Sequence, residues 1–228
     1  MDSIQEMLRA APVIPVLAID ELDQAVPLAQ ALVQGGLPIL EVTLRTDCAL
    51  DAISQIREFV PGAVVGVGTL LSAATLDDAK RAGSQFVVCP GATRPVIERA
   101  LDTGVPLLPG VATASEVMLC LEHGLENLKF FPAEAAGGSA VLKAFYGPFP
   151  QVVFCPTGGI SPSNMSQYLT LPNVLTVGGS WMVPREMLAT GDWSGIQALA
   201  ADATQKALAC DADGNSQVEH ARAVPGQG

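Results

Sequence analysis

Two charged residues, Glu41 and Lys129, stand inside short apolar segments that are typical of buried strands. Buried strands rarely carry charge, so each of these residues needs a chemical reason for its place. Because side chains alternate between the faces of a strand, Glu41 shares its face with Thr43 and Arg45, and Lys129 shares its face with Phe131. An amine that is removed from water loses part of its preference for the charged form and attacks carbonyl carbon atoms. We therefore predict that Lys129 is a nucleophile.

Lys129 differs from the other lysines of the chain. Lys80, Lys143 and Lys206 lie in segments with helical spacing, and we expect their charges to be solvated. A structural ion pair between Lys129 and Glu41 is the alternative, and it is less favoured because interior ion pairs stabilise a fold weakly. Desolvation favours the free amine and a neighbouring carboxylate favours the ammonium, so the resting charge of Lys129 stays open.

Two glycine pairs near the end of the chain are the second chemical signal. Gly158 and Gly159 follow one apolar run, and Gly178, Gly179 and Ser180 follow the next. Glycine lets the backbone approach a ligand closely, and backbone N–H groups together with a hydroxyl group bind phosphate. These two loops therefore predict a phosphate site.

Eight apolar runs, each followed by a segment with helical spacing, must position these residues. Their starts lie roughly 20 to 26 residues apart, about the length of one strand–helix unit. The runs are residues 13–19, 38–44, 63–70, 86–89, 105–108, 127–131, 152–155 and 174–177. Eight parallel strands with eight crossovers favour a (β/α)8 TIM barrel over a doubly wound open sheet, for which no G-x-G-x-x-G motif is present.

The barrel explains the placement of both signals. Strands 2 and 6, which carry Glu41 and Lys129, feed the same interior layer of such a barrel, so we expect these side chains to meet near its axis. The glycine pairs follow strands 7 and 8, where barrels commonly bind phosphate. We expect a barrel domain over residues 1–210, with an N-terminal helix and with Asp20 as the N-cap of the helix after the first strand. Residues 211–228 lose the apolar periodicity and are predicted to be a disordered tail.

Composition narrows the classes of partner and compartment. The net charge of −11 argues against nucleic acid and against an anionic membrane as partners. Five cysteines without a close-spaced pair are typical of a reduced, cytoplasmic protein, and we expect neither a signal peptide nor a membrane-spanning segment. Cys89 and Cys155 are interpreted as small buried hydrophobic residues. His123 and His220 are the only histidines and neither is a plausible ligand, so we expect no metal and no cofactor.

Four motifs together resemble the bacterial 2-keto-3-deoxy-6-phosphogluconate (KDPG) aldolases of the Entner–Doudoroff pathway. They are EVTLRT from Glu41, GVGT from Gly66, KFFPAE from Lys129 and CPTGGISP from Cys155. The resemblance covers residues 12–193 in order. It implies that Lys129 is the Schiff-base lysine of a class I aldolase and that Glu41 is the general acid/base.

The same resemblance implies a binding role for further residues. Arg45 and Thr69 would hold the pyruvate carboxylate, and Pro90 and Phe131 would line the pocket beside it. Thr157 would lie near the hydroxyl-bearing carbon atoms, and this residue together with the KFFP sequence indicates the gluconate rather than the galactonate type of substrate. The phosphate would be bound by Gly158, Gly159, Gly179 and Ser180. The family implies a homotrimer, activity toward 4-hydroxy-2-oxoglutarate and a phosphorylated keto acid as the small-molecule partner. One departure from the family pattern is Ala135–Ala136, where a polar residue is common at the second position.

Three rival functions stay open at this stage. A metal-dependent aldolase would need a cluster of histidine or carboxylate ligands. A phosphosugar isomerase would use Glu41 as the base and Lys129 as an electrostatic partner, without a covalent adduct. A non-catalytic protein that binds phosphometabolites would keep the phosphate loops, but binding alone would not require an interior lysine.

Overall fold

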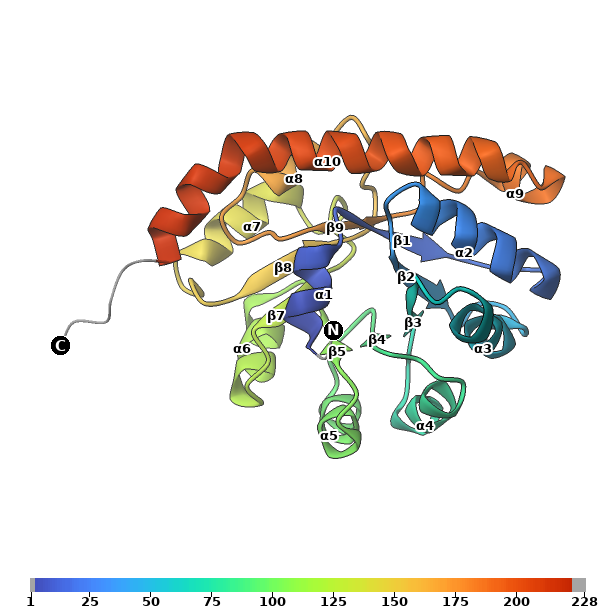
Figure 1. Cartoon of the computed structure of the whole chain (residues 1–228). Coiled ribbons are helices and arrows are strands. Elements are labelled where there is room, and N and C mark those ends of the chain that lie inside the picture. Colours follow the sequence, from blue (N-terminus) through green and yellow to red (C-terminus); the bar gives the residue numbers. More distant parts are fainter. Residues whose placement is uncertain (1–2, 223–228) are drawn as a thin grey trace.

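Strands and helices alternate along the chain and curl into an α/β fold, with the helices outside the strands (Figure 1). The structure is a computed structural model that describes the backbone of residues 3–222 and the side chains of residues 3–210. The strands are β1 (Val13–Leu17), β2 (Ile39–Thr43), β3 (Val64–Gly68), β4 (Val87–Val88), β5 (Leu107–Leu108), β6 (Gly110–Val111), β7 (Asn127–Phe130), β8 (Val153–Pro156) and β9 (Val177–Gly179). The helices are α1 (Ile4–Ala10), η1 (Leu22–Gln24), α2 (Ala25–Gln34), α3 (Ala49–Phe59), α4 (Ala73–Arg81), α5 (Arg94–Thr103), α6 (Ala114–Glu122), α7 (Gly138–Tyr146), α8 (Met165–Leu169), α9 (Arg185–Thr190) and α10 (Trp193–Arg222).

All of the strand pairs described are parallel, as the crossovers require. Six strands form one sheet in the order β5-β4-β3-β2-β1-β9, and three form a second sheet in the order β6-β7-β8. Pro109 separates β5 from β6 because proline has no N–H to donate to a ladder. Two isolated bridges, Phe154 with Val174 and Thr157 with Gly178, connect β8 to the region of β9.

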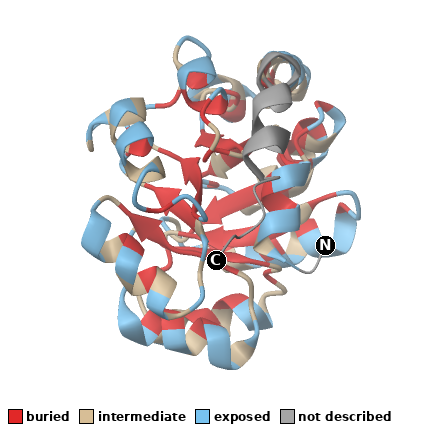
Figure 2. Cartoon of the chain, turned by 90° about the vertical axis from the view of Figure 1, so that its left-hand side faces the viewer, coloured by how far each residue is buried: buried red, intermediate tan, exposed pale blue. Residues whose placement is uncertain are grey.

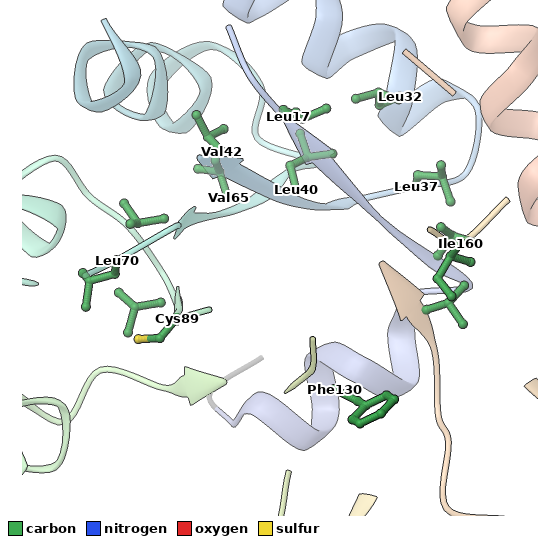
Figure 3. Close-up of a cluster of buried hydrophobic side chains, with 14 of the residues drawn as sticks. Leu17, Leu32, Leu37, Leu40, Val42, Val65, Leu70, Cys89, Phe130 and Ile160 are labelled. Carbon is green, nitrogen blue, oxygen red and sulfur yellow. The ribbon is translucent and has the colours of Figure 1, made fainter. Parts of the chain in front are cut away.

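Side chains alternate along β2 as the sequence predicts. Leu40 and Val42 belong to the larger core, which lies between the strands and the surrounding helices. Figure 3 shows Leu40 and Leu17 near Leu32 of α2. Ile39 belongs instead to a smaller core on the opposite face, the face that also carries Glu41. In Figure 2 the strands are buried, whereas the helices bury only the side turned toward them.

Helix α1 closes one end of this smaller core. Ser3 caps the helix by accepting a hydrogen bond from the Glu6 N–H. Met7 and Leu8, which are completely buried, pack among inward-facing strand residues that include Phe86. Because α1 covers the amino-terminal ends of the strands, the polar inward residues that lie further along each strand face the carboxyl-terminal ends.

Two predicted boundaries differ from the structure, namely the start of the helix after β1 and the start of the C-terminal tail. Asp20 is not a helix N-cap: the short η1 turn precedes α2, whose N-cap Gln24 makes no side-chain cap hydrogen bond. Helix α10 extends to Arg222, so its backbone continues into the segment 211–228 for which the sequence predicts a disordered tail. Residues 223–228 lie outside the described residues, and disorder there stays a prediction. In the described part of the chain, no helix combines the length and apolarity needed to cross a bilayer.

Candidate active site

Lys129 and Glu41 meet inside the fold. This confirms the predicted approach of the second and sixth apolar runs, which are observed as β2 and β7. The Lys129 Nζ atom lies 3.1 Å from Glu41 Oε1 and 3.3 Å from Oε2. Both residues are buried, with 5% of Lys129 and 3% of Glu41 exposed. Lys80, Lys143 and Lys206 are exposed, as predicted, so Lys129 is the one lysine in the described side chains that is withdrawn from water.

Backbone contacts fix the start of the Lys129 side chain. The Lys129 N–H donates to the carbonyl of Pro109 at 2.8 Å, and Lys129 is the strand partner of Gly110. The side chain then extends toward Phe131, with Nζ 5.3 Å from the centre of the ring. An ammonium ion at this distance from an aromatic face is stabilised by the ring quadrupole. The alternation predicted for β7 is thereby confirmed for both residues.

A glycine makes room for the Glu41 carboxylate. Gly68 lies on the neighbouring strand β3 with Thr43 as its partner, one inward position beyond Glu41. A Cβ atom added at Gly68 would lie 2.3 Å from Glu41 Oε1, closer than any real contact. The GVGT motif therefore has a steric reason for its second glycine.

The two thiols nearest the ion pair are inert. Burial raises the pKa of Cys89 to about 12, with Lys129 lowering it and Glu41 raising it to smaller extents. Burial likewise raises the pKa of Cys155 to about 12, again against a lowering effect of Lys129. Thiols with such pKa values stay protonated at neutral pH and are poor nucleophiles. Their interpretation as small buried residues agrees with these shifts.

A cavity of about 290 Å³ opens at the carboxyl-terminal ends of β1, β2 and β9. Its lining includes Val16, which is the strand partner of Glu41, and Thr43, the next inward residue of β2. Arg45 and Ser180 also line it, so two residues that the family resemblance assigns to opposite ends of a substrate share one cavity, although neither Glu41 nor Lys129 belongs to its lining. Arg185 and Asp20 are the other charged residues that line the cavity.

The Gly158–Gly159 loop lies beside Phe131, on the side of the site formed by β7 and β8. Both glycines adopt the left-handed region, with φ values of 100° and 78°, which side-chain-bearing residues rarely adopt. A Cβ atom at Gly158 would lie 3.3 Å from the Phe131 ring. Thr157 is buried and pairs with Gly178, which connects this loop to the one that carries Ser180.

Glu134 braces the same loop from the side. Its N–H donates to the carbonyl of Gly158 at 3.1 Å, and its carboxylate accepts a hydrogen bond from the Tyr168 hydroxyl. Burial and the bond to Glu134 raise the pKa of Tyr168, which keeps its hydroxyl group a donor. A Cβ atom at Gly159 would lie 2.6 Å from Glu134 Cγ, so the loop and its brace are in close contact.

Thr69 and Pro90 stand at the ends of β3 and β4. Thr69 is the one non-glycine residue with a positive φ among residues 3–222, at 59°. A β-branched residue in this region is strained, and such strain concentrates at functional sites. The carbonyl of Pro90 approaches Gly110, the partner of Lys129, so closely that a Cβ atom at Gly110 would lie 2.4 Å from it. Both residues are half-buried, just beyond the carboxyl-terminal ends of β3 and β4.

Sequence reasoning missed three features of this site, namely Gly68, the Glu134–Tyr168 contact and Arg185. Glu134 stands inside the KFFPAE motif, but its partner lies 34 residues away and no local pattern indicates it. Arg185 had a weak signal, because it is the first lysine or arginine after Lys143 and follows the Gly178–Ser180 loop closely.

Comparison with known proteins shows the family to which this chain is similar. Residues 4–199 match the family model of KDPG and KHG aldolases, where KHG is 4-hydroxy-2-oxoglutarate. The KHG/KDPG aldolase of Escherichia coli strain K12 is 50% identical over 205 residues, which cover 90% of this chain and 96% of that protein.

Two solved structures show the same fold. The KDPG aldolase of Zymomonas mobilis ZM4, solved with 3-phosphoglycerate, gives a TM-score of 0.84 at 51% identity and covers 90% of this chain and 96% of its own. The KDPG aldolase of Legionella pneumophila, with pyruvate captured as a covalent carbinolamine, gives 0.85 at 47% identity and covers 86% and 96%. With its buried lysine–glutamate pair and these relatives over nearly its whole length, the chain belongs to the KDPG and KHG aldolase family.

Proposed function

We propose that this protein is a class I aldolase that cleaves KDPG into pyruvate and glyceraldehyde 3-phosphate through a Schiff base on Lys129. The observation that carries the proposal is the buried Lys129 amine, 3.1 Å from the Glu41 carboxylate. The Legionella relative supports it, since pyruvate forms a covalent carbinolamine in that protein. Cleavage of 4-hydroxy-2-oxoglutarate into pyruvate and glyoxylate is the second activity, because the family model names that substrate as well.

The reaction follows from the lysine–glutamate pair. The neutral Lys129 amine attacks the C2 ketone, and the carbinolamine loses water to give an iminium ion. Glu41 takes the proton of the C4 hydroxyl group while the C3–C4 bond breaks, and the bonding electrons flow into the iminium. The aldehyde leaves, C3 of the enamine takes up a proton from Glu41, and hydrolysis returns pyruvate and the free amine.

The substrate spans the mouth of the site. The Arg45 guanidinium group offers two parallel donors to the pyruvate carboxylate, and Thr69 adds a hydroxyl group. Pro90 and Phe131 line the pocket beside this end, and Thr157 lies near the hydroxyl-bearing carbon atoms. The phosphate is bound by Gly158, Gly159, Gly179 and Ser180.

The finer architecture belongs to the same proposal. The two sheets form a single closed (β/α)8 barrel, with Pro109 inside its fifth strand and the two bridges between β8 and β9 at the closure. The protein acts in the cytoplasm as a homotrimer. Sedimentation velocity is expected to give a mass about three times the 23.6 kDa of one chain, and a monomer at micromolar concentration would contradict the trimer.

Borohydride trapping tests the mechanism. Reduction in the presence of pyruvate, followed by peptide mass spectrometry, is expected to give a pyruvyl adduct on Lys129 and none in Lys129→Ala. Lys143→Ala, which removes an exposed lysine, is the matched control and should keep the adduct. An active protein without an adduct would favour the isomerase. A folded protein that binds phosphosugar acids without turnover would favour the binding protein, and activity lost in EDTA would favour a metal-dependent aldolase.

A further inference from the structure

Arg185 is a second cationic side chain at the mouth of the cavity, and none of the motifs includes it. It lines the same cavity as Ser180 and Arg45. Its guanidinium group has no ion pair and no hydrogen bond within the described part of the chain, whereas Arg81, Arg94 and Arg99 each pair with a carboxylate. A free guanidinium group on a cavity wall is available to a ligand.

The backbone beneath Arg185 is anchored. Leu188, one turn further along α9, is buried in the larger core, and its carbonyl accepts a hydrogen bond from Gln24 Nε2 at 3.4 Å. Helix α9 therefore has a fixed position against the barrel wall. A charge that starts from a fixed helix needs less ordering when it binds an anion.

The charges around the cavity favour a dianion. Arg45 and Arg185 contribute two positive charges and Asp20 contributes one negative charge to its wall. The lining of this cavity is therefore positive in a molecule whose total charge is −11, and a further carboxylate group, that of Glu21, lines the adjoining cavity with Asp20 and Arg185. The loops assigned to the phosphate consist of glycines, Ser180 and Thr157, and they contain no cation. A phosphate monoester carries about −1.5 to −2 charges at neutral pH and binds guanidinium groups through two parallel hydrogen bonds.

We propose that Arg185 is a specificity-determining residue that binds the phosphate of the substrate together with Ser180. This inference rests on the proposed aldolase function and deepens it, since it names the cation of the phosphate site. Arg45 then serves the carboxylate end, and Arg185 separates phosphorylated from unphosphorylated 2-keto-3-deoxy acids.

Kinetics of Arg185→Ala test the assignment. We expect kcat/KM for KDPG to fall by about 10- to 100-fold, mostly through KM, because a charged hydrogen bond to the phosphate is lost. We also expect inorganic phosphate to become a weaker competitive inhibitor by a similar factor. Cleavage of unphosphorylated 2-keto-3-deoxygluconate and borohydride trapping of pyruvate should change less than about threefold. Arg185→Lys should recover only part of the phosphate effect, since it restores the charge but not the two parallel donors.

The matched control is Arg57→Ala, which removes an exposed arginine from the last turn of α3, at the opposite end of the strands. It should leave all four measurements unchanged. Equal losses with phosphorylated and unphosphorylated substrates, weaker pyruvate trapping, or no change in phosphate inhibition would each overturn the role of Arg185. Absence of a pyruvate adduct in the wild-type protein would instead contradict the aldolase function, and titration calorimetry with inorganic phosphate would still report on Arg185.

Discussion

At the residue scale, Gly68 decides where the Glu41 carboxylate can lie. In Gly68→Ala, the new Cβ atom would overlap Glu41 Oε1 and move the carboxylate away from Lys129. A displacement of about 1 Å can cost about 100-fold in rate, so we expect kcat for KDPG cleavage to fall by roughly that factor. Steady-state kinetics measures the loss of kcat, and urea unfolding measures separately any loss of stability.

Gly91→Ala is the control for this substitution, because nothing lies within 4 Å of a Cβ atom at that position. It should leave kcat unchanged. Full activity in a folded Gly68→Ala protein would show that Glu41 has room to move and that its position beside Lys129 is not required.

The buried thiols make stability depend on alkaline pH. The pKa of Cys155 is raised to about 12 in the folded chain, so the folded chain keeps a proton that the unfolded chain loses above about pH 9. The free energy of unfolding should therefore fall by about 1.4 kcal/mol per pH unit for this thiol between those values. Urea unfolding across this pH range should show a shallower decline in Cys155→Ala. Identical slopes in the two proteins would mean that the folded-state pKa is not raised.

At this scale alternation predicts the lysine–glutamate pair, whereas the other binding residues come from the glycine loops and the family resemblance. The faces of Glu41 and Lys129 could be predicted because period two fixes which way each strand residue points, and burial of both faces makes a charge conspicuous. Arg185 could not be predicted in the same way. Its direction depends on how Leu188 anchors a six-residue helix against the core, which is a tertiary contact.

At the element scale, α1 acts as the closure of the amino-terminal end. Leu8 is fully buried, and its truncation to alanine leaves a cavity that costs about 2–5 kcal/mol of unfolding free energy. Gln5→Ala, on the exposed side of the same helix, should stay within about 0.5 kcal/mol of the wild type. Urea denaturation compares the two variants. Equal stabilities would show that α1 contributes no packing to the fold.

The predicted strand boundaries are wrong where the side chains are not apolar enough to mark a strand. The predicted strand 174–177 is observed as β9 at Val177–Gly179, because glycines add no hydrophobicity that could extend an apolar run. The fifth predicted strand stops at Leu108 but resumes as β6 beyond Pro109, since the proline interrupts the ladder only locally. Strand β8 extends one residue beyond its predicted run, to Pro156. The remaining runs each contain the observed strand, because buried parallel strands are continuously apolar.

At the scale of the whole molecule, the two ends of the strands have opposite characters. The amino-terminal ends are sealed by Met7 and Leu8 of α1. The carboxyl-terminal ends carry the cavity with Arg45 and Arg185, while negative charge dominates the chain as a whole. We therefore expect a phosphorylated keto acid to be attracted only locally, at the carboxyl-terminal ends of the strands.

The packing of α10 indicates which C-terminal residues stabilise the fold. Ile196, Ala200, Ala203 and Ala207 form a buried stripe on α10, which lies along α2 and α8 (Figure 1). A Cβ atom at Gly35 would lie 2.4 Å from the Ala200 Cβ, so the two helices touch with almost no space between them. Among the described side chains, which end at residue 210, the last member of this stripe is Ala207.

Truncation of the chain tests this boundary. A protein that ends at Cys210 keeps these four buried residues, so its free energy of unfolding and its kcat should match those of the full chain within about 0.5 kcal/mol and about twofold. A protein that ends at Leu199 loses the contacts of Ala200 and Ala203 and the hydrogen bond from Thr204 Oγ1 to the Gly35 carbonyl. Its stability should fall by at least about 2 kcal/mol. A large loss already in the longer protein would show that residues 211–228 stabilise the fold and that the domain extends beyond residue 210.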